Sequence, residues 1–331
     1  MSNGPISKSD CVLLADIGGT NARLALMKGY EIGVIDHLEV ADFPSVTDAI
    51  ATFLQRRAPR HKPDVAVLGV AGPVENNCCT VTNSRWLVDG VKLKQAFGLD
   101  AVKLLNDFEA VAWSLPELQP QDVYALGAQR STAGAPMLAL GPGTGFGAAC
   151  LFFPDGLPFA AVTEAGHATL PATSDREAEV IAYLRHHFDH VSIERVLSGT
   201  GLENLHQAIA SIDRVTAPAR DAAAITKAAL EGSCEVSQTT LDMFCSFLGA
   251  VAGDLALTFA ARGGVYIAGG IVPRFADRLW RSSFRKQFES KGRFESYLRD
   301  IPSQVVVSTD ASFIGLKAFF HHKMVGSQGR P

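Results

Sequence analysis

The sequence predicts an α/β protein built of two domains, and three observations lead to that prediction. The chain has 331 residues, which is more than one ordinary compact core fills. Hydrophobic residues make up 47% of it and charged residues 19%, a composition that is typical of a well-buried globular protein and excludes a disordered one. Short apolar runs, many of them followed by glycines, alternate with segments of helical spacing, as expected where helices join parallel strands.

The first half of the chain shows this alternation most clearly. Three apolar runs, at residues 11–17, 22–27 and 33–40, are punctuated by glycines and predict a β-meander. Residues 45–57 then place their apolar side chains on one face of a helix. The remaining elements expected here are a buried strand at 64–71, a helix at 89–97, a strand at 101–105 and an apolar helix at 108–115.

A second domain is expected to begin near residues 116–120, where prolines interrupt the pattern. We expect the closing helix of the chain to pack back on the first domain, so the predicted domains are 1–116 with 309–331 and 117–308. The expected elements are strands at 137–140, 146–153 and 157–162, mainly helices from 175 to 261, strands at 265–268 and 304–308, and the closing helix at 311–322.

Charge and cysteine content narrow the class of protein. The formal net charge of −4, without a basic cluster, argues against a nucleic-acid or anionic-membrane surface. The cysteines form no C-x-x-C pair and no zinc-binding spacing, which indicates reduced thiols in a cytosolic protein. The polar first ten residues lack the apolar core of a secretory signal, and the apolar stretch 243–253 is shorter than the ~20 residues of a spanning helix. We therefore expect a soluble, cytoplasmic protein.

Three glycine-rich turns follow apolar runs. Glycine lets backbone N–H groups approach an anion closely, and successive N–H groups form a cation-like nest. Any one of these turns alone predicts no more than a tight β-turn, whereas the set of three predicts phosphate binding. The turns are Asp16-Ile17-Gly18-Gly19-Thr20-Asn21, Gly141-Pro142-Gly143-Thr144-Gly145-Phe146-Gly147 and Ala268-Gly269-Gly270.

The second turn also matches the G-x-G-x-x-[GA] fingerprint of a dinucleotide site, at residues 143–148. That fingerprint has to open a helix. Here it opens an aromatic-rich run that favours a strand, so we predict a strand–turn–strand hairpin that holds phosphates. No G-x-x-x-x-G-K-[ST] motif is present, which excludes a P-loop enzyme.

Polar residues near the strand ends offer groups that could bind a sugar. Asn106 and Asp107 end a predicted strand, where Asp107 could be a helix N-cap and a carboxylate at the ligand-binding edge of the sheet, since the two roles are compatible. Glu164 and His167 follow another strand, and a histidine there could donate to a sugar oxygen while the carboxylate accepts from a hydroxyl.

Two further candidates carry less information by themselves. Glu194 is read by default as a solvated helix residue paired with an arginine, and Asn83 either caps a turn or reaches the site. A polyol needs several fixed partners, because an unpaired buried polar group costs about 1–3 kcal/mol. An asparagine, an aspartate, two glutamates and a histidine suffice for one hexose.

Taken together, the motifs resemble the bacterial glucokinase family, which belongs to the superfamily shared by sugar kinases, actin and heat-shock chaperones. The resemblance extends from about residue 13 to about residue 318, with the motifs in the family's order, which is more specific than any single motif. They are DIGGTNAR (16–23), LLNDFEAVAW (104–113), GPGTGFG (141–147), EAGH (164–167), ERVLSGTGL (194–202) and VYIAGGIVPRF (265–275).

The resemblance implies two actin-like, ribonuclease H-like domains with the active site in a cleft between them. It implies phosphorylation of D-glucose to glucose 6-phosphate with ATP and Mg²⁺, in a cytoplasmic homodimer. The implied roles are Asp107 as general base; Asn106, Glu164, His167 and Glu194 as glucose ligands, with Asn83 as a helper; Gly18, Gly19, Thr20, Asn21, Gly143, Thr144 and Gly145 around the phosphates; Gly269 and Gly270 near adenosine; and Asp16 orienting Mg²⁺ through water.

One departure from the family concerns Ala165, where the family usually has glycine. If that position needs a positive φ, alanine is strained there and displaces Glu164 and His167. The cysteine-rich zinc motif of the related repressor–kinase group is absent, so no metal beyond Mg²⁺ is expected.

Other readings stay open at this stage. Within the kinases, the substrate could be another hexose or an N-acetylhexosamine. Outside them stand a sugar-responsive transcription regulator, an NAD(P)-dependent oxidoreductase and an actin-like filament protein. Gly249 and Gly253, on an apolar helix expected at 242–259, permit close packing of helices, either within the chain or between two copies.

Overall fold

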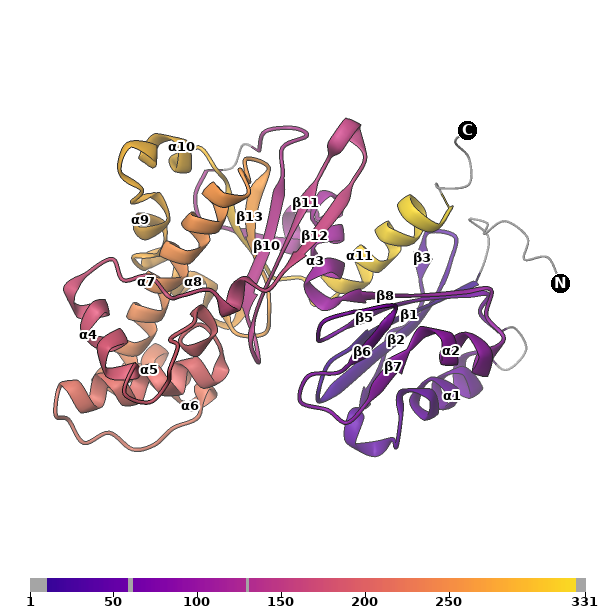
Figure 1. Ribbon diagram of the computed structural model, residues 1–331, viewed down its shortest axis with the longest axis horizontal. Helices are drawn as coiled ribbons and strands as arrows, with labels where there is room; N and C mark the ends of the chain where they lie inside the picture. The colour runs from indigo at the N-terminus through magenta and orange to yellow at the C-terminus, as the bar shows by residue number, and fades with distance from the viewer. Residues whose placement is uncertain (1–10, 59–61, 129–130, 326–331) are drawn as a thin grey trace. The chain divides into compact units, whose positions relative to one another are not determined.

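The computed structural model describes residues 11–58, 62–128 and 131–325. The N-terminal decapeptide and the last residues of the tail, on which part of the sequence prediction rests, lie outside the described residues. The described chain divides into two compact units (Figure 1). Unit 1 runs to Leu118 and resumes at Thr309, and unit 2 comprises Gln119–Ser308.

Unit 1 is built on a sheet with the strand order β3-β2-β1-β5-β8, in which β4 also pairs with β2. Strands β1, β5 and β8 are parallel, and the meander β1–β4 is antiparallel, as the sequence predicts. The predicted run 33–40 forms the short strand β4 instead of a long one. The strands are β1 (Cys11–Ile17), β2 (Asn21–Lys28), β3 (Glu31–Ile32), β4 (Asp36–Glu39), β5 (Val65–Val70) and β8 (Ala101–Asn106), with the separate hairpin β6 (Cys78–Thr80) and β7 (Leu87–Asp89).

Helices cover both faces of this sheet (Figure 1). The apolar side of α1 packs with alternate residues of β1 and β2, and with Trp86, in one core. On the other face, Gly69 of β5 lies against α3 and α11, because a Cβ added there would meet Ala110 at 3.5 Å and Leu316 at 3.8 Å. The closing helix α11 therefore packs on the sheet of unit 1. The helices are α1 (Val46–Arg57), α2 (Gly90–Phe97), α3 (Asp107–Ser114) and α11 (Ala311–Phe319).

Unit 2 has a second mixed sheet, with the order β12-β11-β10-β13-β14-β9. The hairpin β10–β11 is antiparallel, and β10, β13 and β14 are parallel. The glycine-rich turn at 143–145 thus joins two strands, which confirms the predicted hairpin and excludes a helix-opening dinucleotide turn. The strands are β9 (Val123–Ala125), β10 (Met137–Pro142), β11 (Phe146–Phe152), β12 (Phe159–Thr163), β13 (Gly264–Ile267) and β14 (Ser303–Val306).

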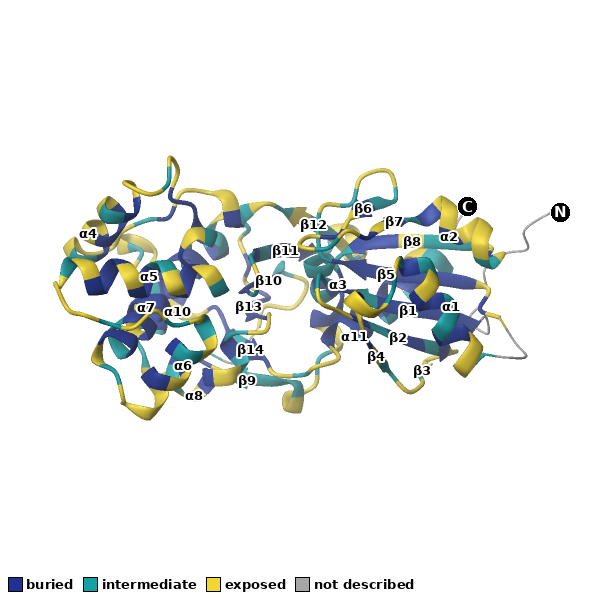
Figure 2. Ribbon diagram, turned by 90° about the horizontal axis from the view of Figure 1, so that it is seen from below, coloured by how far each residue is buried: buried dark blue, intermediate teal, exposed yellow. Residues whose placement is uncertain are grey.

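The helices of unit 2 share one large core with this sheet. Long, mostly buried α7 lies at its centre, and Figure 2 shows α5 and α6 as amphipathic, with buried and exposed faces. The helices are α4 (Asp175–Leu184), α5 (Gly199–Ile212), α6 (Ala222–Glu231), α7 (Glu235–Thr258), α8 (Ala276–Arg281), α9 (Phe284–Glu289) and α10 (Glu295–Arg299).

Helix α7 corrects one detail of the sequence analysis. It has 24 residues with a mean hydropathy of 1.4 over its most apolar window, so its length and composition alone would allow it to cross a membrane. The window is 72% buried within the protein, however, which is the property of a core helix. Its length follows from packing at the centre of unit 2, and the apolar segment 243–253 is only its middle part.

Gly249 and Gly253 of α7 pack against another helix of the same chain. A Cβ added at Gly249 would lie 2.2 Å from the carbonyl oxygen of Phe284, and one added at Gly253 would lie 2.4 Å from that of Phe288. Both glycines therefore let α9 approach α7 closely. This packing is internal, so these glycines give no support to a dimer.

Candidate active site

The predicted site residues of unit 1 gather at one edge of its sheet. In the register of the parallel strands, Ile17 of β1 lies beside Val70 of β5, which lies beside Asn106 of β8. The carboxyl ends of the three strands therefore meet at the same edge, which is where open α/β sheets bind ligands. Asp16 and Asp107 are both at this edge, and the charge of Asp16 contributes to raising the pKa of Asp107.

The first glycine-rich turn, Gly18–Thr20, connects β1 to β2. The Gly18 amide donates to the Asn21 carbonyl at 2.9 Å, which closes the turn, while Thr20 and Asn21 are exposed. A Cβ at Gly19 would lie only 2.5 Å from the carbonyl oxygen of Thr82 and 3.3 Å from the Cβ of Asn83. The glycine thus brings the loop of Asn83 against the turn, and Asn83 itself has a φ of 58° and is exposed.

Asp16 is held by residues that the sequence analysis did not single out. Its Oδ2 atom accepts hydrogen bonds from Nε and Nη2 of Arg23 and from Oγ of Ser312. Asp16 and Arg23 are direct partners across the antiparallel β1–β2 ladder. This contact was predictable in principle, because the two residues are equally distant from the turn and face the same side of the hairpin.

Asn106 is the N-cap of α3, which corrects the reading of Asp107 as a possible cap. The backbone of Asn106 is extended, and its Oδ1 accepts from the amides of Phe108 at 3.0 Å and Glu109 at 3.3 Å. Its Nδ2 donates to the carbonyl of Gly72 at 3.0 Å. Burial raises the pKa of the neighbouring Asp107 carboxyl, and a hydrogen bond with the Asn106 side chain opposes that rise.

Asp107 is the first residue of α3 and is partly buried. Burial raises the pKa of its carboxyl to about 6, and a hydrogen bond from the Phe108 amide at 2.9 Å opposes that shift. A carboxylate with such a pKa is ionised at neutral pH and is more basic than an ordinary aspartate. The neighbouring Cys79 stays a thiol, because burial and the charge of Asp107 raise its pKa to about 11.

In unit 2, the backbone of Phe146 brings three predicted groups together. Its amide follows the 143–145 turn and donates to Oε2 of Glu194 at 2.9 Å. A Cβ on Gly166 would lie 2.3 Å from its carbonyl oxygen, so the Glu164–His167 loop rests against the same residue. Glu194 is therefore a partner of the turn, in the short 3₁₀ helix η6 (Ile193–Arg195), and not a solvated residue paired with an arginine.

Glu164 and His167 are both largely exposed, with their side chains 69% and 66% accessible. The Nε2 atom of His167 lies 3.9 Å from Oε2 of Glu164, and the His167 amide donates to the Glu164 carbonyl at 3.0 Å. Ala165 begins the short 3₁₀ helix η5 (Ala165–His167) and is not among the residues with positive φ. The strain considered for alanine at this position is therefore absent.

The second and third glycine-rich turns lie side by side. A Cβ at Gly269, whose φ is +93°, would lie 2.4 Å from the carbonyl oxygen of Pro142, and the Gly199 amide donates to the Gly143 carbonyl at 2.9 Å. At Gly143 and Gly270, by contrast, an added Cβ meets no atom within 4 Å. Packing does not require glycine at these two positions, so open space for a ligand is the better explanation of them.

Asp16 and the glycine-rich turn that follows it fit a nucleotide bound with Mg²⁺. Mg²⁺ keeps several waters and usually takes one or two carboxylates together with substrate phosphates. Within the described ranges, no group of three or more histidines, cysteines, aspartates or glutamates forms a cage for a metal. Asp16, whose hydrogen bonds all reach Oδ2, is suited to orienting a hydrated metal through its other oxygen.

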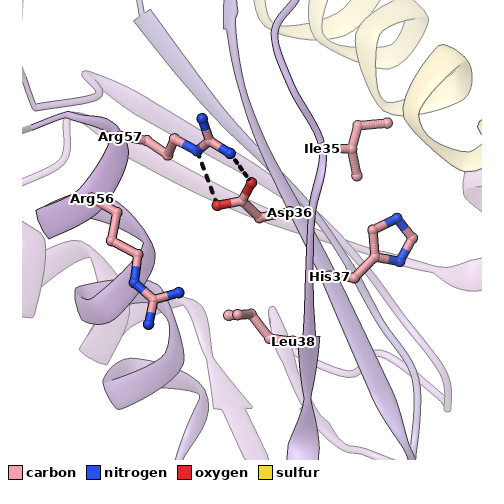
Figure 3. A pocket seen from close by; sticks show the side chains of 6 residues that line it. All are labelled: Ile35, Asp36, His37, Leu38, Arg56 and Arg57. Carbon is pink, nitrogen blue, oxygen red and sulfur yellow. Dashed lines mark hydrogen bonds and ion pairs between the residues drawn. The ribbon is translucent and has the colours of Figure 1, made fainter.

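A separate hollow of about 430 Å³ lies on unit 1, between β4 and α1 (Figure 3). Arg57 there forms a bidentate ion pair with Asp36, and Arg56 and His37 also line the hollow. None of the predicted site residues lines it. It is therefore distinct from the candidate active site.

Comparison with known proteins supports one family along the whole chain. A family model described as Glucokinase matches residues 13–323. A glucokinase of Paramagnetospirillum magneticum is 42% identical over 311 residues, which cover 93% of this chain and 97% of the relative. A glucokinase of Aromatoleum aromaticum is 41% identical over 320 residues, 96% of each chain.

Solved structures agree with the sequence relatives. The crystal structure of a glucokinase from an Antarctic psychrotroph has a TM-score of 0.86 at 38% identity, covering 94% of this chain and 99% of that one. A ROK family glucokinase of Streptomyces griseus, solved with glucose and AMPPNP, has a TM-score of 0.63 at 19% identity and covers 93% and 98% of the two chains. At that identity the second likeness concerns the fold alone.

Proposed function

The chain belongs to the glucokinase family, an enzyme family that phosphorylates glucose, and on that premise we propose how its residues carry out the reaction. The proposed reaction transfers the γ-phosphoryl group of ATP to the 6-hydroxyl of D-glucose. The observation that carries the proposal is Asp107, a partly buried carboxylate with a pKa of about 6 at the sheet edge that also bears Asp16.

Asp107 is the proposed general base. The oxygen of the glucose 6-hydroxyl forms a bond to the γ-phosphorus while the bond from that phosphorus to the bridging oxygen breaks. ADP leaves with the electron pair, and the hydroxyl proton passes to Asp107. Phosphoryl transfer has a loose transition state, so positioning of the hydroxyl contributes more than the strength of the base.

The remaining hydroxyls of the sugar are proposed to bind Asn106, Glu164, His167 and Glu194, with Asn83 as a helper. Support comes from the exposure of Glu164 and His167. Oε2 of Glu194 accepts from the Phe146 amide, and the carboxylate keeps capacity to accept from a sugar hydroxyl. These proposed ligands come from both units, and the actin-like fold of the two domains is a part of the proposal that rests on the family resemblance.

The phosphates of ATP are proposed to bind the turn of Gly18, Gly19, Thr20 and Asn21 and the turn of Gly143, Thr144 and Gly145, with Gly269 and Gly270 near adenosine. Backbone N–H groups in such turns provide positive potential without side chains. Mg²⁺ would supply charge neutralisation on the phosphates, and Asp16 would orient it through bound water.

The reaction is tested by measuring ADP release from Mg-ATP with glucose, mannose, fructose, galactose, N-acetylglucosamine or no sugar. Strong turnover that depends on glucose alone is expected. Turnover with a different sugar would keep Asp107 as the base and reassign the sugar ligands. Absence of sugar-dependent turnover would refute a sugar-kinase activity and would favour a regulator or filament protein.

The base is tested by Asp107→Asn. We expect kcat to fall by several orders of magnitude while glucose still binds, because the variant keeps the shape of the side chain and loses proton acceptance. Isothermal calorimetry measures the glucose affinity and a coupled ADP assay measures kcat. Near-normal turnover of the variant would show that another group accepts the proton.

A cytoplasmic location and a homodimeric state complete the proposal, and both derive from the family resemblance. The described cysteines are all free, which agrees with a reducing compartment. Sedimentation equilibrium of the purified protein tests the dimer, and a mass of one chain would reject it.

A further inference from the structure

Arg23 contacts Asp16, the residue proposed to orient Mg²⁺, and was not among the site residues predicted from the sequence. Its Nε and Nη2 atoms both donate to Oδ2 of Asp16, and Nη2 also donates to Oγ of Ser312 at 2.9 Å. Ser312 in turn donates to the same Oδ2 at 2.9 Å. Three donors thus fix a single oxygen of one carboxylate.

The other side of the guanidinium reaches the start of the C-terminal segment. Nη1 donates to the carbonyl oxygen of Thr309 and lies 3.8 Å from a carboxylate oxygen of Asp310. The guanidinium carbon stands 5.4 Å from the ring centre of Phe313. Thr309 is the residue at which the chain re-enters unit 1, so Arg23 joins the β1–β2 hairpin to that point of return.

We propose that Arg23, together with Ser312, is a positioning residue that holds Asp16 with its Oδ2 engaged and its Oδ1 directed to the hydrated Mg²⁺ of the nucleotide. This inference deepens the proposed function and rests on it. Among the described residues, every hydrogen bond to the Asp16 side chain goes to Oδ2, so Oδ1 is the oxygen available to a metal-bound water. Mutation of the partners that orient a metal-binding carboxylate typically costs about 10- to 100-fold in metal affinity or activity.

The planar fork of arginine explains why this residue type fits the position. Two N–H groups of the rigid guanidinium converge on Oδ2 of Asp16, whereas the ammonium of lysine is a point charge without this fixed geometry. The third nitrogen reaches Thr309 at the same time. Arg23→Lys would keep the charge beside Asp16 and lose the orientation.

The test compares ADP binding with and without Mg²⁺, measured by isothermal calorimetry, in the wild type, Arg23→Lys, Arg23→Met and Ser312→Ala. We expect Mg²⁺ to strengthen ADP binding in the wild type, and Arg23→Met to reduce that strengthening by about 10- to 100-fold. Ser312→Ala and Arg23→Lys should reduce the strengthening of ADP binding by Mg²⁺ to an intermediate extent. ADP affinity without Mg²⁺ and the KM for glucose should change less than twofold, while the Mg²⁺ concentration for half-maximal kcat rises.

The matched control is Arg57→Met. Arg57 also pairs with an aspartate of unit 1 through Nε and Nη2, although it uses both oxygens of Asp36, and it lies at the separate hollow of Figure 3, which no proposed site residue lines. Arg57→Met should leave the strengthening of ADP binding by Mg²⁺ unchanged. Circular dichroism and thermal unfolding establish which variants fold. If Arg23→Met does not fold, the comparison of Arg23→Lys and Ser312→Ala with the wild type tests the inference.

Folded Arg23 and Ser312 variants that bind Mg-ADP as the wild type does would overturn the inference. Equal weakening of ADP binding with and without Mg²⁺ would also overturn it, since that pattern indicates general damage to the nucleotide site. Failure of the proposed function gives a different result: the wild type would then lack glucose-dependent turnover, whatever its Mg²⁺-dependent ADP affinity.

Discussion

At the scale of single residues, Asp107 links activity to pH. Its pKa of about 6 predicts that kcat/KM falls as the pH drops below that value, because the protonated carboxyl no longer accepts the hydroxyl proton. A pH–rate profile of the wild type from pH 5 to 8 measures this limb. A profile that stays flat down to pH 5 would contradict both the raised pKa and the assigned base.

The same shift predicts a change in stability. The folded-state pKa lies above the ordinary value of 3.8, so folding favours the protonated form, and this contribution is lost as the pH rises through about 6. Asp107→Asn removes the buried charge and should stabilise the protein at pH 8 by up to about 3 kcal/mol, and much less at pH 4. Urea unfolding at the two pH values measures this, and an equal effect at both would reject the explanation.

At the scale of elements, Glu177 ties helix α4 to helix α7. This carboxylate is 2% exposed, its Oε1 accepts from Oγ of Ser246 at 2.6 Å, and its Oε2 accepts from the amide and hydroxyl of Thr173. Glu177→Ala leaves buried donors unpaired and should cost about 3 kcal/mol or more of unfolding free energy. Glu179→Ala, on the exposed face of the same helix, is the control; it removes only a surface ion pair with Arg176 and should cost at most about 1 kcal/mol.

The contact of α7 with α9 gives a second prediction at this scale. The Cβ introduced by Gly249→Ala would lie 2.2 Å from the carbonyl oxygen of Phe284. The two helices must therefore move apart, which should lower the free energy of unfolding by about 1–3 kcal/mol. Chemical denaturation compares it with Lys227→Ala, an exposed substitution on α6. A stabilised Gly249→Ala protein would mean that helix propensity outweighs the backbone clash.

At the scale of the whole molecule, the chain leaves unit 1 at Leu118 and returns to it at Thr309, so α11 completes a unit that begins some 300 residues earlier. Buried Phe313 and Leu316 belong to this helix. Trp86 and Trp113, both buried, report on unit 1, and Trp280 of unit 2 is 56% exposed and should change its fluorescence less on unfolding. Most helices, by contrast, belong to unit 2.

Phe313→Ala should therefore lower the midpoint of unfolding monitored by tryptophan fluorescence, with a loss of about 3–5 kcal/mol. The midpoint followed by far-ultraviolet circular dichroism should move less. Phe284→Ala in unit 2 is the matched control, and we expect it to shift the dichroism transition more than the fluorescence transition. Coincident shifts in both variants would show that the two units unfold as one.

Local signals in the sequence were sufficient for most elements and for the family. The helices expected at 45–57 and 89–97 form as α1 and α2, with Ser45 and Asp89 as their N-caps. The alternation of apolar runs predicted both sheets and the 143–145 hairpin. These features depend on neighbours in the chain. The order of six motifs along the chain then predicted the glucokinase family, which the comparisons confirm.

Only the tertiary structure decided how the site residues are used. The cap role of Asn106, the bond from Phe146 to Glu194 and the unstrained backbone of Ala165 depend on segments that the fold brings together. The hydrogen bonds of Ser312 with Asp16 and Arg23 join residues almost 300 positions apart. Periodicity and propensity act over a few residues, whereas burial, which sets the pKa of Asp107, depends on packing by distant elements, and that is why it could not be read from the sequence alone.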